Sequence, residues 1–425
     1  MKSFHQPILV IVLLGLLAGT GAEEPKRPQA VPDQKQFDYS PAIDRLQAAI
    51  RHEVEQKQLP AFSISLVDGD QMVWAAGFGF QDKDQKIRAT EKTVYRVGSV
   101  SKLFTDIAVM QLVESGALDL NATVQTYLPE FKPNNPFGGE ISVLQLMTHR
   151  SGLVRESPVG NYFDPTEPSL AETVASLNNT ALVYKPGTKT KYSNAAVAVV
   201  GAVLEKELEV SHAAQVRQKI LDPLKMNHSG FTVTPAVEQH LATGWMRTND
   251  GRRFVAPTFL LGTGPAGNLY SNVVDLAKFL TCLFNAGQFQ DGQILKRESF
   301  QTMLAPQKDP DGKPQRFGIG FAIQDFDGLT KVGHGGAVYG FSTQLEALPE
   351  RKLGVAAVAS LDGTNGVVGR LADYALRLML ATQDGKPLPL YRMTGPVPAE
   401  RAKELVGLYR NAEEKKLARI TELNG

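Results

Sequence analysis

Apolar and polar residues alternate with a period of two near both ends of the chain, a pattern typical of half-buried strands. In the N-terminal part, residues 61–67 and 72–76 alternate on either side of Asp68-Gly69-Asp70, a composition that predicts a hairpin turn. The C-terminal part repeats the pattern. Further strands are predicted at residues 317–323, 330–332, 342–348 and 353–359.

The middle of the chain carries a helical period instead. After Gly98 the apolar spacing changes to that of a helix, and Gly116 follows the apolar stripe where glycine ends many helices. Helices are predicted at residues 44–56, 103–113, 144–147, 171–177, 195–207, 213–220, 273–284 and 367–380. Strands at both ends with helices between them predict the α/β (α+β) class. We expect a mainly antiparallel sheet, assembled from the N- and C-terminal segments and flanked by helices, with an inserted helical subdomain.

The first residues form a separate pattern. Lys2 precedes an apolar run at residues 8–18, and small residues follow at 19–22, which together predict a signal peptide over residues 1–22. The run is shorter than the ~20 apolar residues that span a bilayer. We expect an exported protein, periplasmic or extracellular, without a stable membrane span after cleavage. An uncleaved N-terminal anchor is the alternative.

Proline-rich stretches divide the rest of the chain. Residues 23–38 are polar and contain three prolines, which predicts a flexible segment. One large domain is predicted over residues 39–382, and four prolines predict a linker over residues 383–399. Residues 400–425 resemble the start of a small β module, which we expect to be incomplete because two strands alone are marginally stable.

Composition narrows the class of partner. The chain has 425 residues, with 45 basic and 44 acidic side chains and a net charge of +1. No basic excess is available to neutralise phosphates, which argues against nucleic acid as a partner. Cys282 is the one cysteine, so no intrachain disulfide can form, and its apolar helical surroundings predict a buried residue.

The candidate chemistry begins at Ser99 and Lys102, which form the one S-x-x-K in the chain. Residues three apart on a helix lie on one face, so the hydroxyl and the amine would be neighbours. The helix N-terminus favours a developing oxyanion, and a desolvated lysine there loses its proton more easily and can act as a base. Chance alone supplies about one S-x-x-K in a chain of this length. The alternative is therefore that Ser99 only caps the helix and Lys102 is a surface lysine.

A tyrosine two residues before an asparagine occurs three times, at residues 192–194, 270–272 and 409–411. Such a tyrosine could relay a proton near a Ser–Lys pair, and the asparagine amide could hold a substrate. Asn272 is also expected to cap a helix, with Asp275 three residues later. The motif beyond the linker is the least plausible, but local residues alone leave the other two close to even.

Gly333-His334-Gly335-Gly336 follows a short predicted strand. The glycines would let a substrate backbone lie close to that strand, and the Ala337 amide would be a second oxyanion donor beside that of Ser99. A glycine-rich hairpin turn with a surface histidine is the stronger interpretation on local sequence alone.

Taken together, these segments resemble the serine β-lactamase-related family, which includes class C β-lactamases, penicillin-binding carboxypeptidases, D-aminopeptidases and esterases. The resemblance covers about residues 40–380, in the family's order. It is carried by residues 95–102, 146–153, 186–188, 192–194, 267–271 and 333–336.

The resemblance implies a β-lactamase/transpeptidase-like fold and an acyl-enzyme route without cofactor or metal. Ser99 would attack a carbonyl while Lys102 and Tyr192 share proton transfer, and Tyr270 would belong to a structural helix start. The implied substrate-binding residues are Asn194, His334, Gly335 and Gly336, and the implied oxyanion donors are the amides of Ser99 and Ala337.

One departure from the family pattern bears on the substrate. His334 stands where classical β-lactamases and carboxypeptidases carry the lysine of Lys-Thr-Gly, so a permanent charge for a substrate carboxylate is lost. We therefore expect a serine hydrolase for an ester, amide or D-amino-acid peptide. A true β-lactamase and a catalytically silent binding or sensor protein are the alternatives.

Other hydrolase classes lack their signatures in this sequence. An α/β-hydrolase needs a G-x-S-x-G nucleophile elbow, and none occurs. The seven histidines are scattered, without the H-x-H or H-E-x-x-H spacing of zinc sites. His149, within residues 146–153, is expected to be structural.

Overall fold

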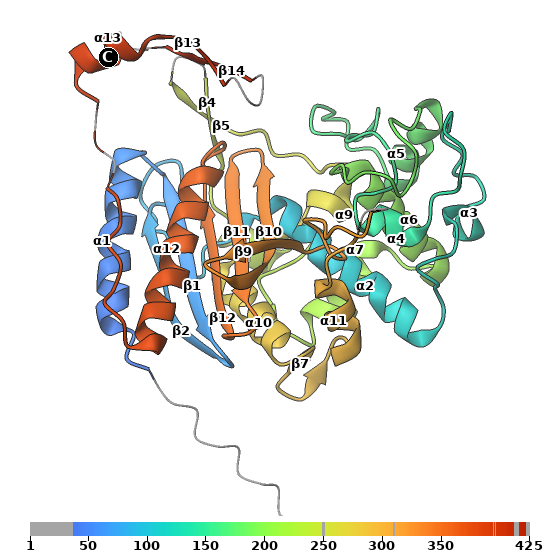
Figure 1. Cartoon of the computed structure of the whole chain (residues 1–425), viewed down its shortest axis with the longest axis horizontal. Helices are drawn as coiled ribbons and strands as arrows, with labels where there is room; N and C mark the ends of the chain where they lie inside the picture. Colours follow the sequence, from blue (N-terminus) through green and yellow to red (C-terminus); the bar gives the residue numbers. More distant parts are fainter. Residues whose placement is uncertain are drawn as a thin grey trace, which may run out of the picture. The chain divides into compact units, whose positions relative to one another are not determined.

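An antiparallel sheet of six strands forms the centre of the computed structural model, in the order β2-β1-β12-β11-β10-β9 (Figure 1). The structure describes residues 37–248, 251–308, 311–393, 395, 397–411 and 416–421. The predicted signal peptide and most of the predicted flexible segment lie outside these residues. The strands are β1 (Ala61–Asp68), β2 (Gln71–Gly79), β9 (Ala322–Phe326), β10 (Leu329–Val338), β11 (Phe341–Leu348) and β12 (Leu353–Ala359).

The N- and C-terminal segments share this sheet, as predicted. β1 pairs with β12, with Phe62 opposite Ala359, and β1 and β2 form the expected hairpin. Helices cover both faces of the sheet. The helices α1 (Ser40–Gln56) and α12 (Asn365–Asp384) pack on one face, and α10 (Val273–Phe284) packs on the other.

The helical region is inserted between β2 and β9. Its central helix, α2 (Ser101–Ser115), buries every residue from Ser101 to Met110, the property of a helix enclosed on all sides. Gly116 ends α2 in the left-handed conformation, as predicted. The other helices are α3 (Val124–Tyr127), α4 (Val143–Met147), α5 (Leu170–Ser176), α6 (Asn194–Leu208), α7 (His212–Val216), α8 (Pro235–Glu238), α9 (Gly264–Gly267) and α11 (Arg297–Leu304), with single helical turns at Gly98–Val100, Leu177–Asn179 and Arg217–Leu221.

Short strand pairs connect these elements. β3 (Tyr95–Arg96) pairs with β6 (Tyr270–Ser271), β4 (Trp245–Arg247) pairs with β5 (Arg253–Val255), and β7 (Gln288–Phe289) pairs with β8 (Gly292–Gln293). Within the described ranges, the structure contains no helix with the length and apolar character needed to cross a membrane.

Two strand predictions near the C-terminus had the wrong bounds. The strand predicted at residues 317–323 begins only at Ala322, because the Gly318 amide bonds to the Phe321 carbonyl and Gly320 adopts a left-handed φ of 75°, which closes a turn. β10 is longer than predicted and includes the whole glycine-rich segment 333–336. That segment is therefore part of a strand and not the hairpin turn that local sequence favoured. The strand was missed because glycines give no alternation of apolar and polar side chains.

The C-terminal segment begins close against the helices of the sheet. The Tyr391 hydroxyl donates to Glu53 over 2.7 Å, and its ring lies 5.0 Å from that of Tyr374 on α12. The Arg45 side chain on α1 donates to the Leu388 carbonyl over 3.0 Å, so the first part of the predicted linker is fixed in place. Beyond it lie α13 (Ala399–Leu405), β13 (Gly407–Arg410) and β14 (Leu417–Ile420), where a β module was predicted. The division into linker and module stays a prediction.

Two backbones approach closely where β10 passes the turn before α2. Gly98 has a φ of 54°, and a Cβ atom at this residue would lie 2.8 Å from the Ala337 nitrogen. A Cβ atom at Gly336 would lie 2.0 Å from the Val97 carbonyl oxygen. Both glycines are therefore required for the strand to lie against the turn.

Substitution of Gly98 tests this packing, with Gly116 as the matched control. Both residues are left-handed, but a Cβ atom at Gly116 would meet nothing within 4 Å. Gly116→Ala should therefore cost only the left-handed backbone penalty, roughly 1–2 kcal/mol of unfolding free energy. Gly98→Ala should cost clearly more, because β10 must also move. Urea denaturation of both variants measures the difference, and equal losses would contradict the required approach.

Candidate active site

Ser99 and Lys102 meet at the start of α2. Ser99 lies in the helical turn Gly98–Val100, and Lys102 lies in the first turn of α2. The Lys102 ammonium nitrogen Nζ is 3.0 Å from Ser99 Oγ and donates to the Ala266 carbonyl over 2.7 Å. Lys102 is completely buried, whereas Ser99 is partly exposed. The predicted pair is thus assembled, with the hydroxyl accessible and the amine enclosed.

Burial changes the protonation of Lys102. Desolvation disfavours the ammonium and lowers the pKa of Lys102 to about 7, against the smaller opposing effects of Glu156 and Asp106. No carboxylate forms an ion pair with Lys102 in the described part of the chain. A large fraction of the amine is therefore neutral near pH 7, and it can accept the Ser99 proton.

Tyr192 is the tyrosine that the fold brings to this pair. Its ring centroid lies 4.9 Å from Lys102 Nζ. Its buried hydroxyl has no hydrogen-bond partner among the described residues. Burial raises the pKa of the Tyr192 hydroxyl far above its ordinary value, although the neighbouring Ser99 hydroxyl opposes this change. The phenol therefore remains protonated, which suits it to donate or relay a proton and leaves Lys102 as the base.

The competing tyrosines lie elsewhere. Tyr270 belongs to β6, and its ring faces the Arg96 guanidinium at 5.8 Å. Asn272 caps α10 by accepting the Asp275 amide over 2.8 Å, as predicted. Tyr409, on β13, is 43% exposed. Of the three motifs, only that at residues 192–194 contacts the Ser99–Lys102 pair.

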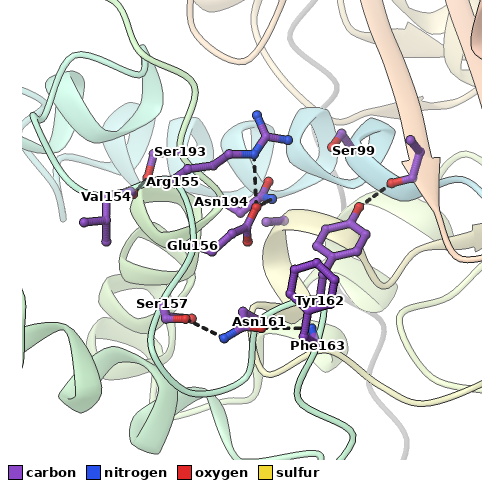
Figure 2. A network of polar contacts seen from close by, with 12 residues as sticks. Ser99, Val154, Arg155, Glu156, Ser157, Asn161, Tyr162, Phe163, Ser193 and Asn194 are labelled. Atoms are coloured by element: carbon purple, nitrogen blue, oxygen red, sulfur yellow. Dashed lines mark hydrogen bonds and ion pairs between the residues drawn. The ribbon is translucent and has the colours of Figure 1, made fainter.

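Asn194 lies at the first turn of α6, beside two residues that the sequence did not single out. Its amide nitrogen donates to Glu156 Oε1 over 2.7 Å, and Arg155 Nε lies 3.2 Å from the same oxygen (Figure 2). The Arg155 guanidinium also lies 5.2 Å from the Tyr192 ring centroid. Glu156 Oε2 and Asn194 Oδ1 are buried and find no donor among the residues described. Arg155 and Glu156 follow the matched segment 146–153 in a loop and have no periodicity that could have identified them.

His334 is a buried, neutral histidine in the middle of β10. Its Nδ1 contacts the Gly335 carbonyl, which can only accept, so Nδ1 carries the proton and Nε2 is an acceptor. Nε2 has no partner within the described chain. Burial, assisted by the Lys102 charge, lowers the pKa of His334 to about 4. The imidazole lies 5.8 Å from the Tyr192 ring, and none of the acidic residues that the structure describes holds it in the charged form.

The Ala337 amide faces the Ser99 turn. The Tyr162 hydroxyl donates to the Ala337 carbonyl (Figure 2), and the amide and carbonyl of one strand residue lie on the same edge. Asn365 donates over 2.7 Å to the Gly336 carbonyl, which belongs to the same peptide group as the Ala337 amide. Hydrogen bonds in series polarise one another, so Asn365 strengthens this amide as a donor. Tyr162 and Asn365 were not found from the sequence.

These contacts permit acyl transfer. A carbonyl carbon next to Ser99 Oγ would have a base at Lys102, a protonated phenol at Tyr192 and backbone amides from Ser99 and Ala337 for the oxyanion. Gly335 and Gly336 lie in β10, and Gly336 packs closely against the Val97 carbonyl. The catalytic and substrate-binding roles remain predictions.

Reactivity of Ser99 should follow the protonation of Lys102. Because only the neutral amine accepts a proton, the rate of Ser99 modification by a fluorophosphonate should fall about tenfold per pH unit below pH 7 and level off above it. Stopped-flow or gel-based labelling between pH 5 and 9 measures this profile, and Lys102→Met should abolish it. A midpoint near 4 would instead indicate His334 as the base.

Comparison with known proteins places this chain among β-lactamase-related proteins. The model of the Beta-lactamase family matches residues 46–379. Protein flp of Staphylococcus aureus (strain MW2) is 24% identical over 319 residues, which cover 75% of this chain and 63% of that protein. Teichoic acid D-alanine hydrolase of Staphylococcus aureus is 29% identical over 219 residues, which cover 52% of this chain and 53% of that protein. The chain thus spans less than two thirds of the length of these relatives.

A solved structure supports the same grouping. The octameric penicillin-binding protein homologue from Pyrococcus abyssi has a TM-score of 0.70 and 28% identity to this chain, with 89% of this chain and 85% of that chain covered. These matches confirm the resemblance and the fold that the sequence predicted.

Proposed function

Because this chain belongs to the beta-lactamase family, we propose that it is a serine hydrolase that works through a covalent acyl-enzyme. The observation that carries the proposal is the 3.0 Å contact between Ser99 Oγ and the buried Lys102 amine, whose pKa is lowered to about 7. A surface lysine beside a helix cap would be solvated and charged, so the alternative of a structural S-x-x-K does not account for this burial.

The geometry supports the following sequence of steps. Ser99 Oγ attacks the substrate carbonyl carbon and its proton passes to Lys102 Nζ, while the Ser99 and Ala337 amides stabilise the oxyanion. The bond to the leaving group then breaks, and the leaving atom receives a proton through Lys102 and Tyr192. Water attacks the acyl-enzyme by the same route and regenerates Ser99.

Covalent trapping tests the nucleophile. A fluorophosphonate should add to one residue, and peptide mass mapping should place the adduct on Ser99. Ser99→Ala should lose turnover of p-nitrophenyl acetate, because the acyl-enzyme cannot form. An adduct on another residue, or undiminished turnover by Ser99→Ala, would refute the assignment. A protein that neither labels nor turns over would favour the silent binding or sensor alternative.

The unpaired polar atoms around Ser99 support a class of substrate. Glu156 Oε2, Asn194 Oδ1 and His334 Nε2 are acceptors without donors among the described residues. A protonated amine supplies three donors and a positive charge, which suits a site with a carboxylate and neutral acceptors. A substrate carboxylate would face these acceptors without a donor to bind it. The relative named teichoic acid D-alanine hydrolase is consistent with an aminoacyl substrate. We therefore favour esters or amides of an amine-bearing acyl group, such as D-alanyl, over β-lactams.

A matched pair of substrates tests the amine. The p-nitroanilides of D-alanine and propionic acid differ only in the amino group. A charge-assisted hydrogen bond contributes about 1.5–3 kcal/mol. Glu156→Gln should therefore lower kcat/KM for the D-alanyl substrate by roughly ten- to a hundredfold and leave the propionyl substrate within about threefold. Equal losses for both substrates would show that Glu156 does not recognise the amine. Nitrocefin turnover comparable to that of the D-alanyl substrate would favour a true β-lactamase.

We also propose that the protein is exported. Lys2 and the apolar run at residues 8–18 support this, although both lie outside the residues that the structure describes.

A further inference from the structure

We propose that His149 is a positioning residue that holds the Tyr192 phenol against the Ser99–Lys102 pair. The inference rests on the proposed function and adds a residue to it. His149 does not itself contact Ser99 or Lys102 through a hydrogen bond. Its effect on the reaction would pass through Tyr192.

His149 contacts the chain on both sides of Tyr192. Its carbonyl accepts the Lys191 amide over 2.8 Å, and its Nδ1 accepts the Ser193 amide over 3.3 Å. Between these two contacts, the imidazole packs against the Tyr192 ring at a tilt of 39°, with centroids 4.4 Å apart. One residue thus fixes the backbone before and after the tyrosine, and the ring between.

Tyr192 needs such support because its hydroxyl group has no well-formed hydrogen bond in the described chain. The Tyr192 hydroxyl is buried and makes no hydrogen bond of standard geometry with the described residues, and the Ser99 hydroxyl, which is near enough to lower its pKa, is the reacting group itself. Its location therefore depends on how the ring is packed. His149 lies 4.4 Å from the ring centroid, Phe317 lies 6.2 Å away, and Lys102 Nζ lies at 4.9 Å. Phe317 also packs edge-on against His149 at 5.1 Å.

The backbone conformation of His149 indicates that its imidazole makes stabilising contacts. His149 follows α4 with a φ of 57°, a left-handed conformation in which glycine is the least strained residue. The imidazole is also 1% exposed. A turn that only needed to end α4 would be more stable with glycine at this position, so the strain and the burial are offset by contacts that the imidazole makes.

The His149 imidazole is neutral while it packs against Tyr192. Nδ1 accepts a hydrogen bond, so the proton of the neutral ring is on Nε2. Burial lowers the pKa of His149 well below its ordinary value, and the nearby Lys102, His334 and Arg155 act in the same direction. His149 therefore supports Tyr192 over the whole pH range in which Lys102 titrates, and it adds no ionisation of its own.

Two substitutions separate positioning from folding. His149→Gly removes the imidazole and relieves the left-handed strain, which offsets part of the stability lost with the buried ring, and urea denaturation of the variant verifies that it is folded. His149→Asn keeps an acceptor close to the position of Nδ1 in a residue that tolerates a positive φ. With a p-nitroanilide substrate, whose leaving amine must gain a proton, His149→Gly should lower kcat by about 10- to 100-fold, as for a displaced general acid, with KM within about threefold. His149→Asn should recover at least part of this loss.

A double-mutant cycle with Tyr192→Phe gives the decisive comparison. If His149 acts through the Tyr192 hydroxyl, His149→Gly should change kcat by less than about threefold in the Tyr192→Phe background. Multiplicative losses would overturn the inference, and so would an unchanged kcat in His149→Gly alone.

Fluorophosphonate labelling distinguishes the two levels of failure. Labelling of Ser99 and turnover by the unmodified protein, together with independent losses in the cycle, would overturn only the role of His149. Absence of both labelling and turnover in the unmodified protein would overturn the proposed function, and the role of His149 with it.

Discussion

The ammonium group of Lys102, buried without a carboxylate partner, is the interaction on which this site depends. Lowering the pKa from 10.5 to about 7 corresponds to a burial cost for the charged form of about 5 kcal/mol. The same chain shows the opposite arrangement at Lys331. Burial lowers the pKa of Lys331, but Glu346 and Asp373, at 2.8 and 2.6 Å, raise it above its ordinary value. A paired lysine stays charged, whereas Lys102 becomes a base because no carboxylate pairs with it.

The fold supplies the energy for this burial and keeps the Glu156 carboxylate occupied, whereas burial of Asp106 without a donor among the described residues raises the pKa of that carboxyl well above its ordinary value. α2 is enclosed by apolar contacts, including a Phe104–Phe279 pair with ring centroids 4.9 Å apart, and each buried large apolar side chain contributes roughly 1.5–3 kcal/mol. Glu156, the carboxylate with the largest effect on Lys102, is held by Asn194 and Arg155 instead. Ser99 lies between these elements and β10, which approaches as closely as Gly98 and Gly336 allow.

The sequence predicted those features that have a period or a fixed spacing. The alternation in β1 and β12, the spacing of Ser99 and Lys102, and the Asn272 cap were all sufficient to place their elements. The strand β10 was underestimated because its glycines give no alternation. The residues around Tyr192 were missed for a different reason. Arg155, Glu156, Tyr162 and Asn365 come from loops and a helix start far apart in the chain, and only tertiary packing brings them together. His149 was expected to be structural, and its contact with Tyr192 could not be derived from its neighbours in sequence.

Direct titration of Lys102 is the measurement that tests this account most directly. With lysine labelled by ¹³C at Cε, NMR spectra between pH 5 and 11 should show one resonance with a midpoint near pH 7. That resonance should be missing from Lys102→Met, and its midpoint should lie well below the ordinary lysine pKa of about 10.4. If every lysine resonance instead titrates near that ordinary value, Lys102 is charged at neutral pH and cannot be the base.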